Sequence, residues 1–291
     1  MEPSILVLTD FSPAAERARA YAAALAAPLG AVVHLLKVNI PAPMNPEVGR
    51  VLYATNARYV QDDRHSLEQL AANLPGPATA ELAETGWTEA VRHALDEHRP
   101  LLVVAGLTAT TGLLDEWLSN RTLPLAHETG YPLLLVPQNL PDAALHPPRR
   151  LALAVEDAPF QLVRDATTIT PLLDALAPEI VVVTVLSAEA AARDGAGHNG
   201  LRAARQCGLT RSIADSRPHQ MISAQASSEH AAAGIRQAVA ELPADLLVLL
   251  DPDHGWVHKL FRGSVIDQVL RQTTVPVLLL AARVGPLPEQ G

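Results

Sequence analysis

The chain has 291 residues, a length that predicts two domains better than one, and 48% of them are hydrophobic, so each half can bury its own core. The net charge of −9 and the aromatic content of 3% argue against nucleic-acid binding, which depends on basic patches and aromatic stacking. No apolar run approaches the about 18 residues of a membrane span, and no signal-peptide pattern precedes the first apolar run, so we expect a soluble cytoplasmic protein.

The first half alternates apolar strands with helices. The run 5–9 is short and continuously apolar, as in a parallel strand covered on both faces. Ser12 and Pro13 then supply an N-cap and a first-turn proline for an Ala-rich helix that Gly30 ends. Further strands are expected at 32–38, 79–83, 101–105 and 132–136, and further helices at about 48–73, 87–97 and 121–128.

The second half repeats this plan after a proline-rich linker over 137–149. The run 151–155 repeats the first strand, and Glu156 takes the place of Asp10. Later strands are expected at 180–186, 221–226, 246–250 and 275–280, and helices at 161–176, 201–206, 230–241 and 265–271.

The two halves end alike, with TGYPLLL at 129–135 matching TTVPVLL at 273–279, and a duplication explains this likeness. Alternating strands and helices imply parallel sheets with helices on both faces and ligands beyond the carboxyl ends of the strands, between the first and fourth strands. The fifth strands, 133–136 and 277–280, would expose flat apolar edges unless they met, so we expect a pseudo-symmetric pair. One continuous sheet, or unlike topologies before and after residue 145, would contradict this interpretation.

These segments resemble the universal stress protein family, in the adenine-nucleotide α-hydrolase-like branch of Rossmann-like folds. The resemblance rests on ILVLTDFS at 5–12, the loop 106–120, RGSV at 262–265, VLR at 269–271 and VPVL at 275–278. It covers nearly the whole chain twice. It implies an α/β fold of two tandem domains, each a five-stranded parallel sheet with helices on both faces, which we place at 1–140 and 148–284.

ATP-binding members of this family carry Gly-x2-Gly-x9-Gly-Ser/Thr, in which amides and a hydroxyl surround phosphates. The motif is incomplete in both halves: Asp253 and Leu250 stand at the two earlier glycine positions of the second copy. By resemblance, the candidate nucleotide-binding residues are Asp10, Val38, Gly106, Ala109, Gly112, Ser119, Asn120, Glu156, Gly263 and Ser264. ATP, with Mg²⁺ beside it, is the candidate ligand.

Structural roles compete with these functional ones. An Asp after a strand is also a common turn residue, so Asp10 reads equally as a cap. His254 and His258 have the i, i+4 spacing of zinc ligands, but Gly255 favours a loop there and no third ligand is marked. The single cysteine, Cys207, excludes an internal disulfide and reads as a small buried residue.

Three functions therefore stay open. The first is a non-enzymatic stress-response protein that binds ATP or AMP weakly in domain 1 and acts through an unidentified protein partner. The second is an interaction module that has lost ligand binding, and the third is a weak ATPase, for which the sequence marks no general base. The sequence also leaves open whether the chain forms a homodimer and whether residues 41–65 form a lid.

Overall fold

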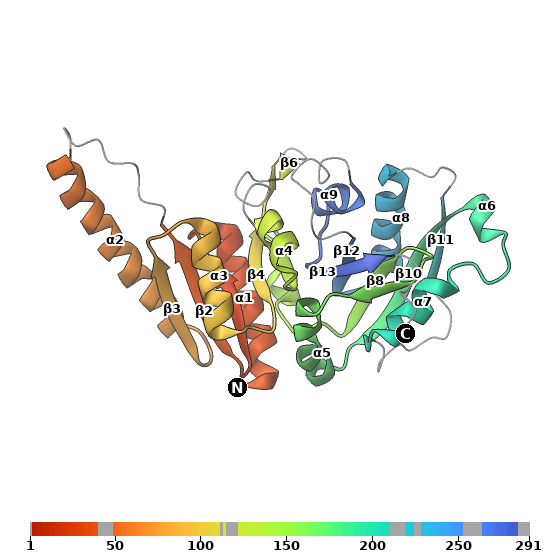
Figure 1. The fold of residues 1–291 in the computed structure, drawn as a ribbon, viewed down its shortest axis with the longest axis horizontal. Coiled ribbons are helices and arrows are strands. Elements are labelled where there is room, and N and C mark those ends of the chain that lie inside the picture. Colours follow the sequence, from red (N-terminus) through yellow and green to blue (C-terminus); the bar gives the residue numbers. More distant parts are fainter. Residues whose placement is uncertain are drawn as a thin grey trace, which may run out of the picture.

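The computed structural model describes residues 2–39, 49–110, 113–114, 122–209, 219–223, 228–252 and 264–284. Within the first half, the five strands of the main sheet alternate with helices as the apolar runs predict, and two short strands form a separate pair (Figure 1). The elements are β1 Ser4–Leu8, α1 Pro13–Ala26, β2 Val32–Val38, α2 Gly49–Ala72, β3 Ala78–Ala83, α3 Trp87–His98, β4 Val103–Leu107, β5 Ala109–Thr110, β6 Leu113–Leu114, α4 Leu123–Thr129 and β7 Leu133–Pro137.

The second half repeats the strands but not every helix. Its elements are β8 Arg150–Val155, β9 Phe160–Leu162, α5 Thr170–Leu176, β10 Glu179–Ser187, α6 Ala188–Ala191, α7 His198–Gln206, β11 His219–Ser223, α8 Ser228–Glu241, β12 Leu246–Pro252, α9 Val265–Leu270 and β13 Val277–Val284.

Both halves have the same sheet topology. The strands lie in the order β3-β2-β1-β4-β7 in the first half and β11-β10-β8-β12-β13 in the second, and every neighbouring pair within a half is parallel. In chain order each half is therefore 3-2-1-4-5, with its switch point between the first and fourth strands. This confirms the predicted pair of α/β domains.

The two fifth strands meet, as expected of the pseudo-symmetric pair. Strand β13 pairs antiparallel with β7, with Val277 opposite Leu135 and Leu279 opposite Leu133. The pairing makes one continuous sheet of eleven strands. The expectation that a continuous sheet would contradict a duplication was wrong, because the shared sheet results from pairing two equivalent edges.

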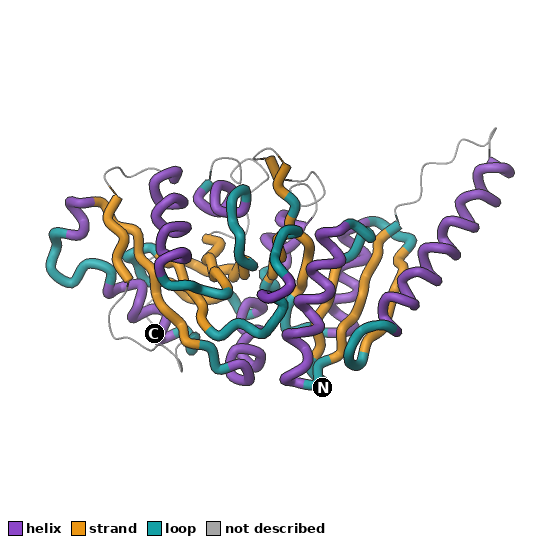
Figure 2. The backbone as a smooth tube through the Cα atoms, turned by 180° about the vertical axis from the view of Figure 1, so that it is seen from behind, coloured by secondary structure: helices purple, strands orange, loops and turns teal. Residues whose placement is uncertain are grey.

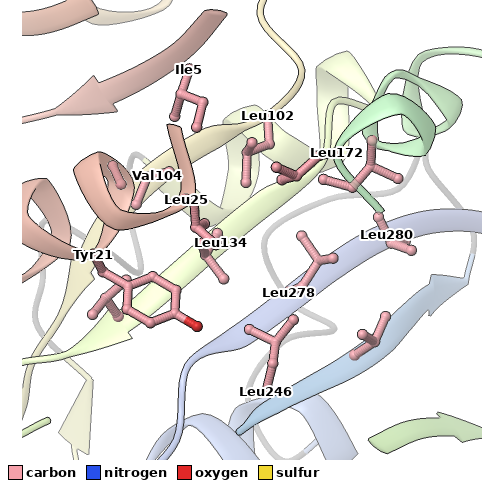
Figure 3. Close-up of a cluster of buried hydrophobic side chains, with 14 of the residues drawn as sticks. Ile5, Tyr21, Leu25, Leu102, Val104, Leu134, Leu172, Leu246, Leu278 and Leu280 are labelled. Carbon is pink, nitrogen blue, oxygen red and sulfur yellow. The ribbon is translucent and has the colours of Figure 1, made fainter. Parts of the chain in front are cut away.

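Helices cover both faces of this sheet (Figure 2). Alternate strand residues supply the two cores. Ile5 and Val7 pack on the face that carries α1, whereas Leu6 and Leu8 pack on the face that carries α3. Each core runs across the junction of the halves. Figure 3 shows this for one face, with labelled side chains from both halves drawn in one cluster.

One predicted helix is wrong. The segment 161–176 was expected to repeat α1, but it begins in β9, continues through a 3₁₀ turn at Asp165–Ile169 and becomes helical only in α5. The cause is β13, which runs past Leu280 to Val284 and offers a free edge. Strand β9 takes this edge, with Phe160 opposite Val284. Tertiary pairing thus overrides the local helical pattern.

Candidate functional site

The first-half candidates Asp10, Val38 and Gly106 lie at one edge of the sheet. Asp10 follows β1, whose neighbours are β2, which ends at Val38, and β4, which contains Gly106. Because these strands are parallel, their carboxyl ends share one edge, where ligands of such folds bind. The topology therefore brings these three residues to the predicted crevice.

Asp10 holds the turn that starts α1. Its Oδ1 accepts a hydrogen bond from the Ser12 amide at 2.9 Å, and Ser12 Oγ, the N-cap, accepts from the Ala15 amide at 3.2 Å. Between them, Phe11 has a φ of 67°, in the left-handed region. The turn is thus stabilised by its own polar groups, as the capping interpretation of Asp10 requires.

A positively charged group at this edge is already paired. Lys37, one residue before the end of β2, places Nζ 3.0 Å from Asp63 Oδ2 of α2 and 4.6 Å from the ring centroid of Phe11. Both contacts favour the ammonium where it lies. An anionic ligand would have to compete with the carboxylate of Asp63. Residues 49–65 of the segment considered as a lid lie in α2, while residues 41–48 lie outside the described part.

Gly106 has a packing role. A Cβ at this position would come within 2.5 Å of the backbone carbonyl carbon of Ala14 and 2.7 Å of its Cβ. The first turn of α1 therefore packs directly on β4. The family motif explains a glycine here by the close approach of a phosphate. The contact with α1 is sufficient by itself to require a residue without a side chain.

The rest of the first-half loop is described only in part. Ala109 lies in β5 and pairs with Leu114 of β6. Gly112, Ser119 and Asn120 lie outside the described residues, so their binding role stays a prediction.

The second half has a cavity of about 430 Å³ beyond the carboxyl ends of β8, β10 and β12. Helices α8 and α9 contribute to its walls, together with β9 and the end of β13. It is lined by Ala154, Val155, Glu156, Ala158, Phe160, Val183, Val185, Ala231, Ile235, Leu249, Leu250, Ser264, Val265, Ile266 and Val284.

Two predicted residues, Glu156 and Ser264, both line this cavity. Glu156 follows β8 and is exposed, whereas Ser264 is the N-cap of α9, its Oγ accepting from the Asp267 amide at 3.1 Å. Asp267 in turn lies 2.9 Å from Arg271, one turn along the helix. The neighbouring candidate Gly263 lies outside the described residues.

The apolar lining residues were not predicted from the sequence, because the motif consists of glycines and polar residues. Phe160, Val183 and Leu249 are almost fully buried, and they line the cavity from three different strands. The small side chains of Ala154, Ala158 and Ala231 line it too and were a signal that could have been noticed.

Other predicted sites receive no support from the described residues. In that part of the chain no group of three His, Cys, Asp or Glu residues could hold a metal ion, while His254 and His258 lie outside it. Cys207 is a half-buried free thiol whose pKa is raised by burial, with Sγ 3.5 Å from the carbonyl oxygen of Phe160. Among the described helices, none has the length and apolar content that crossing a membrane demands.

The duplicated 3-2-1-4-5 parallel sheet defines a tandem protein of the Rossmann-like, adenine-nucleotide α-hydrolase-like class. The model of the Universal stress protein family matches residues 1–137 and 155–281, which is most of the chain. The chain therefore belongs to the universal stress protein family, with two tandem domains, as its motifs predicted.

Solved structures share this fold over nearly the full length. A universal stress protein from Archaeoglobus fulgidus DSM 4304 is 14% identical with a TM-score of 0.67, and the match covers 96% of this chain and 98% of that one. A functionally unknown protein from Pseudomonas aeruginosa PAO1 is 13% identical with a TM-score of 0.54, over 96% of this chain and 92% of that one. No curated protein matches the chain.

Proposed function

We propose that this cytoplasmic universal stress protein is a non-enzymatic binding protein that holds one small ligand in its second domain and acts through a protein partner that recognises the bound form. The cavity at the ends of β8, β10 and β12 carries this proposal. Its volume lies within the about 300–1,000 Å³ typical of small-molecule sites, and its position is where such folds bind ligands.

The contrast between the halves supports the second as the main site. In the first domain α1 packs on Gly106, and Lys37 is paired with Asp63 at the same edge. Weak binding of ATP or AMP with Mg²⁺ there remains the second candidate, favoured by the shared edge of Asp10, Val38 and Gly106. The alternative of a module without any ligand predicts that neither site is occupied.

The lining chemistry favours binding over catalysis. Among the described lining residues, only Glu156 and Ser264 have side chains able to transfer a proton or attack a carbonyl group. The Ser264 hydroxyl already accepts the hydrogen bond that caps α9. Covalent catalysis needs a nucleophile activated by an adjacent base, a role that the capping position of Ser264 does not favour.

The test compares two tryptophan substitutions on one helix. Ala231 of α8 lines the cavity, whereas Ala233 on the same helix is exposed and does not line it. Native mass spectrometry of the purified chain should show one bound small molecule per chain, lost in Ala231→Trp and kept in Ala233→Trp. A ligand kept in both variants would place the site elsewhere, and a ligand lost only in Asp10→Ala would favour the first domain.

A control assay addresses catalysis. Steady release of phosphate from ATP by the wild-type chain, abolished by Asp10→Ala, would support the weak ATPase instead. No such release is expected. If no small molecule co-purifies and a thermal-shift screen of metabolites also gives no shift, the module without a ligand becomes the better interpretation.

A further inference from the structure

We infer that the cavity of the second domain takes a compact, largely apolar molecule with one hydrogen-bond donor, such as an alcohol or an amine, and rejects nucleoside triphosphates. This inference rests on the proposed function, because it names the ligand class of the same cavity. Four observations lead to it: the apolar lining, the residue at the phosphate position, the absence of a lining cation among the described residues, and the wall made by β9.

The lining is apolar over most of its extent. Apart from Glu156 and Ser264, all described lining residues are Ala, Val, Ile, Leu or Phe. They come from both the strand ends and the helices above them, and Val183 and Leu249 are 1% and 3% exposed. An apolar ligand gains by leaving water for such walls, whereas a polar group without a partner is disfavoured there.

A leucine occupies the position where the first domain has its leading glycine. Gly106 lies opposite Val136 in the β4–β7 pair, and Leu250 lies opposite Leu280 in the equivalent β12–β13 pair. In phosphate-binding loops a glycine here lets backbone amides approach the phosphate. In this half Leu250 lines the cavity instead, so an apolar residue stands at the position where phosphate oxygens would need donors.

The charged residues in and near the cavity also disfavour a nucleoside triphosphate. Glu156 is the ionisable residue among the described lining side chains, and neither Lys nor Arg is among them. Asp251, the next residue of β12 after Leu250, is buried. A polyanion would meet the Glu156 carboxylate, with no compensating cation among the described lining residues, whereas the donor of an alcohol or amine can approach Glu156.

The departure of this half from the first explains why the space exists. In the first domain α1 closes over Gly106. In the second, the corresponding segment forms β9 on the edge of β13, and Phe160 of this strand, 2% exposed, becomes a wall of the cavity. The chain has thus replaced a closing helix turn with an aromatic side wall.

The experiment titrates full-length protein, below the probes' aggregation limits, with 1-octanol, octylamine, octanoate, adenosine and ATP with Mg²⁺, using isothermal calorimetry. We expect 1-octanol and octylamine to bind at one site per chain and octanoate to bind at least ~10-fold more weakly, because its carboxylate faces Glu156. Glu156→Gln should reduce the difference in affinity between octylamine and octanoate.

Two blocking variants guard against misfolding. Ala231→Trp on α8 and Ala158→Phe in the loop between β8 and β9 should each abolish octanol binding, while Ala233→Trp keeps it. Circular dichroism melts show whether each variant is folded. Octanol binding that survives in both folded blocking variants would overturn the inference.

The remaining outcomes separate the two proposals. If adenosine or ATP binds the wild type and is lost in the blocking variants but kept in Ala233→Trp, the ligand class is wrong and the proposed function stands. If no probe binds and nothing co-purifies, both fall.

Discussion

Leu134 of β7 lies directly opposite Leu278 of β13, and the two residues are also each other's counterparts in the duplicated sequence. The pairs on either side, Leu135 with Val277 and Leu133 with Leu279, exchange the same two positions. A pseudo-two-fold axis therefore passes between Leu134 and Leu278. The two domains associate through equivalent patches, as the subunits of a symmetric dimer do.

This relationship predicts coupled stability at the axis. Leu134 and Leu278 are both buried in the core cluster of one sheet face, so Leu134→Ala and Leu278→Ala should each lower the free energy of unfolding by about 2–4 kcal/mol. Because the side chains are cross-strand neighbours, the double variant should depart from the sum by at least about 0.5 kcal/mol in urea denaturation. Additive losses would show that the halves do not support each other here.

Tyr21 predicts a stabilising substitution. The residue is 1% exposed, its hydroxyl has no hydrogen-bond partner among the described residues, and burial raises the pKa of this phenol far above its ordinary value. Removing a buried unsatisfied hydroxyl while keeping the ring should raise the free energy of unfolding in Tyr21→Phe by about 1 kcal/mol.

Tyr59→Phe is the matched control for this change, because Tyr59 is 65% exposed, and it should alter stability by less than about 0.5 kcal/mol. A loss of stability in Tyr21→Phe would mean that a buried water molecule satisfies the hydroxyl.

Gly106 predicts a steric cost. Gly106→Ala should lower the free energy of unfolding by about 2–3 kcal/mol, since the new methyl group would overlap the backbone of Ala14 unless α1 moves. Gly86→Ala is the control: a Cβ there meets no atom within 4 Å, and only the change of the helix N-cap, below about 1 kcal/mol, is expected. Unchanged thermal melting of Gly106→Ala would refute the packing role.

His34 predicts a loss of stability in mild acid. Its ring stacks on that of His98 with centroids 3.8 Å apart, and burial, then the charge of His98, lower the His34 pKa to about 4, with Glu97 opposing. The unfolded chain binds this proton at the ordinary pKa near 6.5, so the folded state is favoured fully above that pH. Stability should fall as the pH drops from about 6.5 to 4, by about 1–2 kcal/mol once solvent screening at this half-exposed site is allowed for.

Urea midpoints at pH 7, 6, 5 and 4 measure this effect. Thr79 Oγ1 lies 2.6 Å from His34 Nδ1, and Glu81 Oε2 lies 3.9 Å from His98 Nε2, so Thr79, Glu81 and His98 are left unchanged in the variants. His34→Gln should reduce the fall of the urea midpoint between pH 7 and 4, whereas His65→Gln, on the exposed face of α2, should leave this fall as in the wild type. An unchanged fall in His34→Gln would assign the effect to other groups.

The fold was predictable wherever a segment's own pattern decided its structure. Runs such as 5–9 and 246–250 are too short for helices and too apolar for loops, and both form central strands. The segment 161–176 failed because its structure depends on a distant edge. Nothing in its local pattern reveals that β13 extends to Val284 and pairs with Phe160.

The candidate site divides in the same way. The shared edge of Asp10, Val38 and Gly106 follows from the parallel arrangement of the strands, which the alternation of strands and helices predicted. The cavity does not follow from strand order. It depends on where β9 places Phe160, and on the presence of Leu250 where the motif has a glycine. Motif counting treats Leu250 only as a missing residue, whereas packing makes it part of a wall.

Strands β7 and β13 pair within one polypeptide, so every molecule contains one copy of each of the two unlike domains. Free single-domain subunits meeting at such an edge would form like and unlike pairs together, because their backbone hydrogen bonds do not distinguish one copy from the other. Covalent linkage ensures that each first domain pairs with a second domain. Each half could then diverge, one acquiring β9 and its cavity and the other keeping α1 against Gly106, without producing a mixed population.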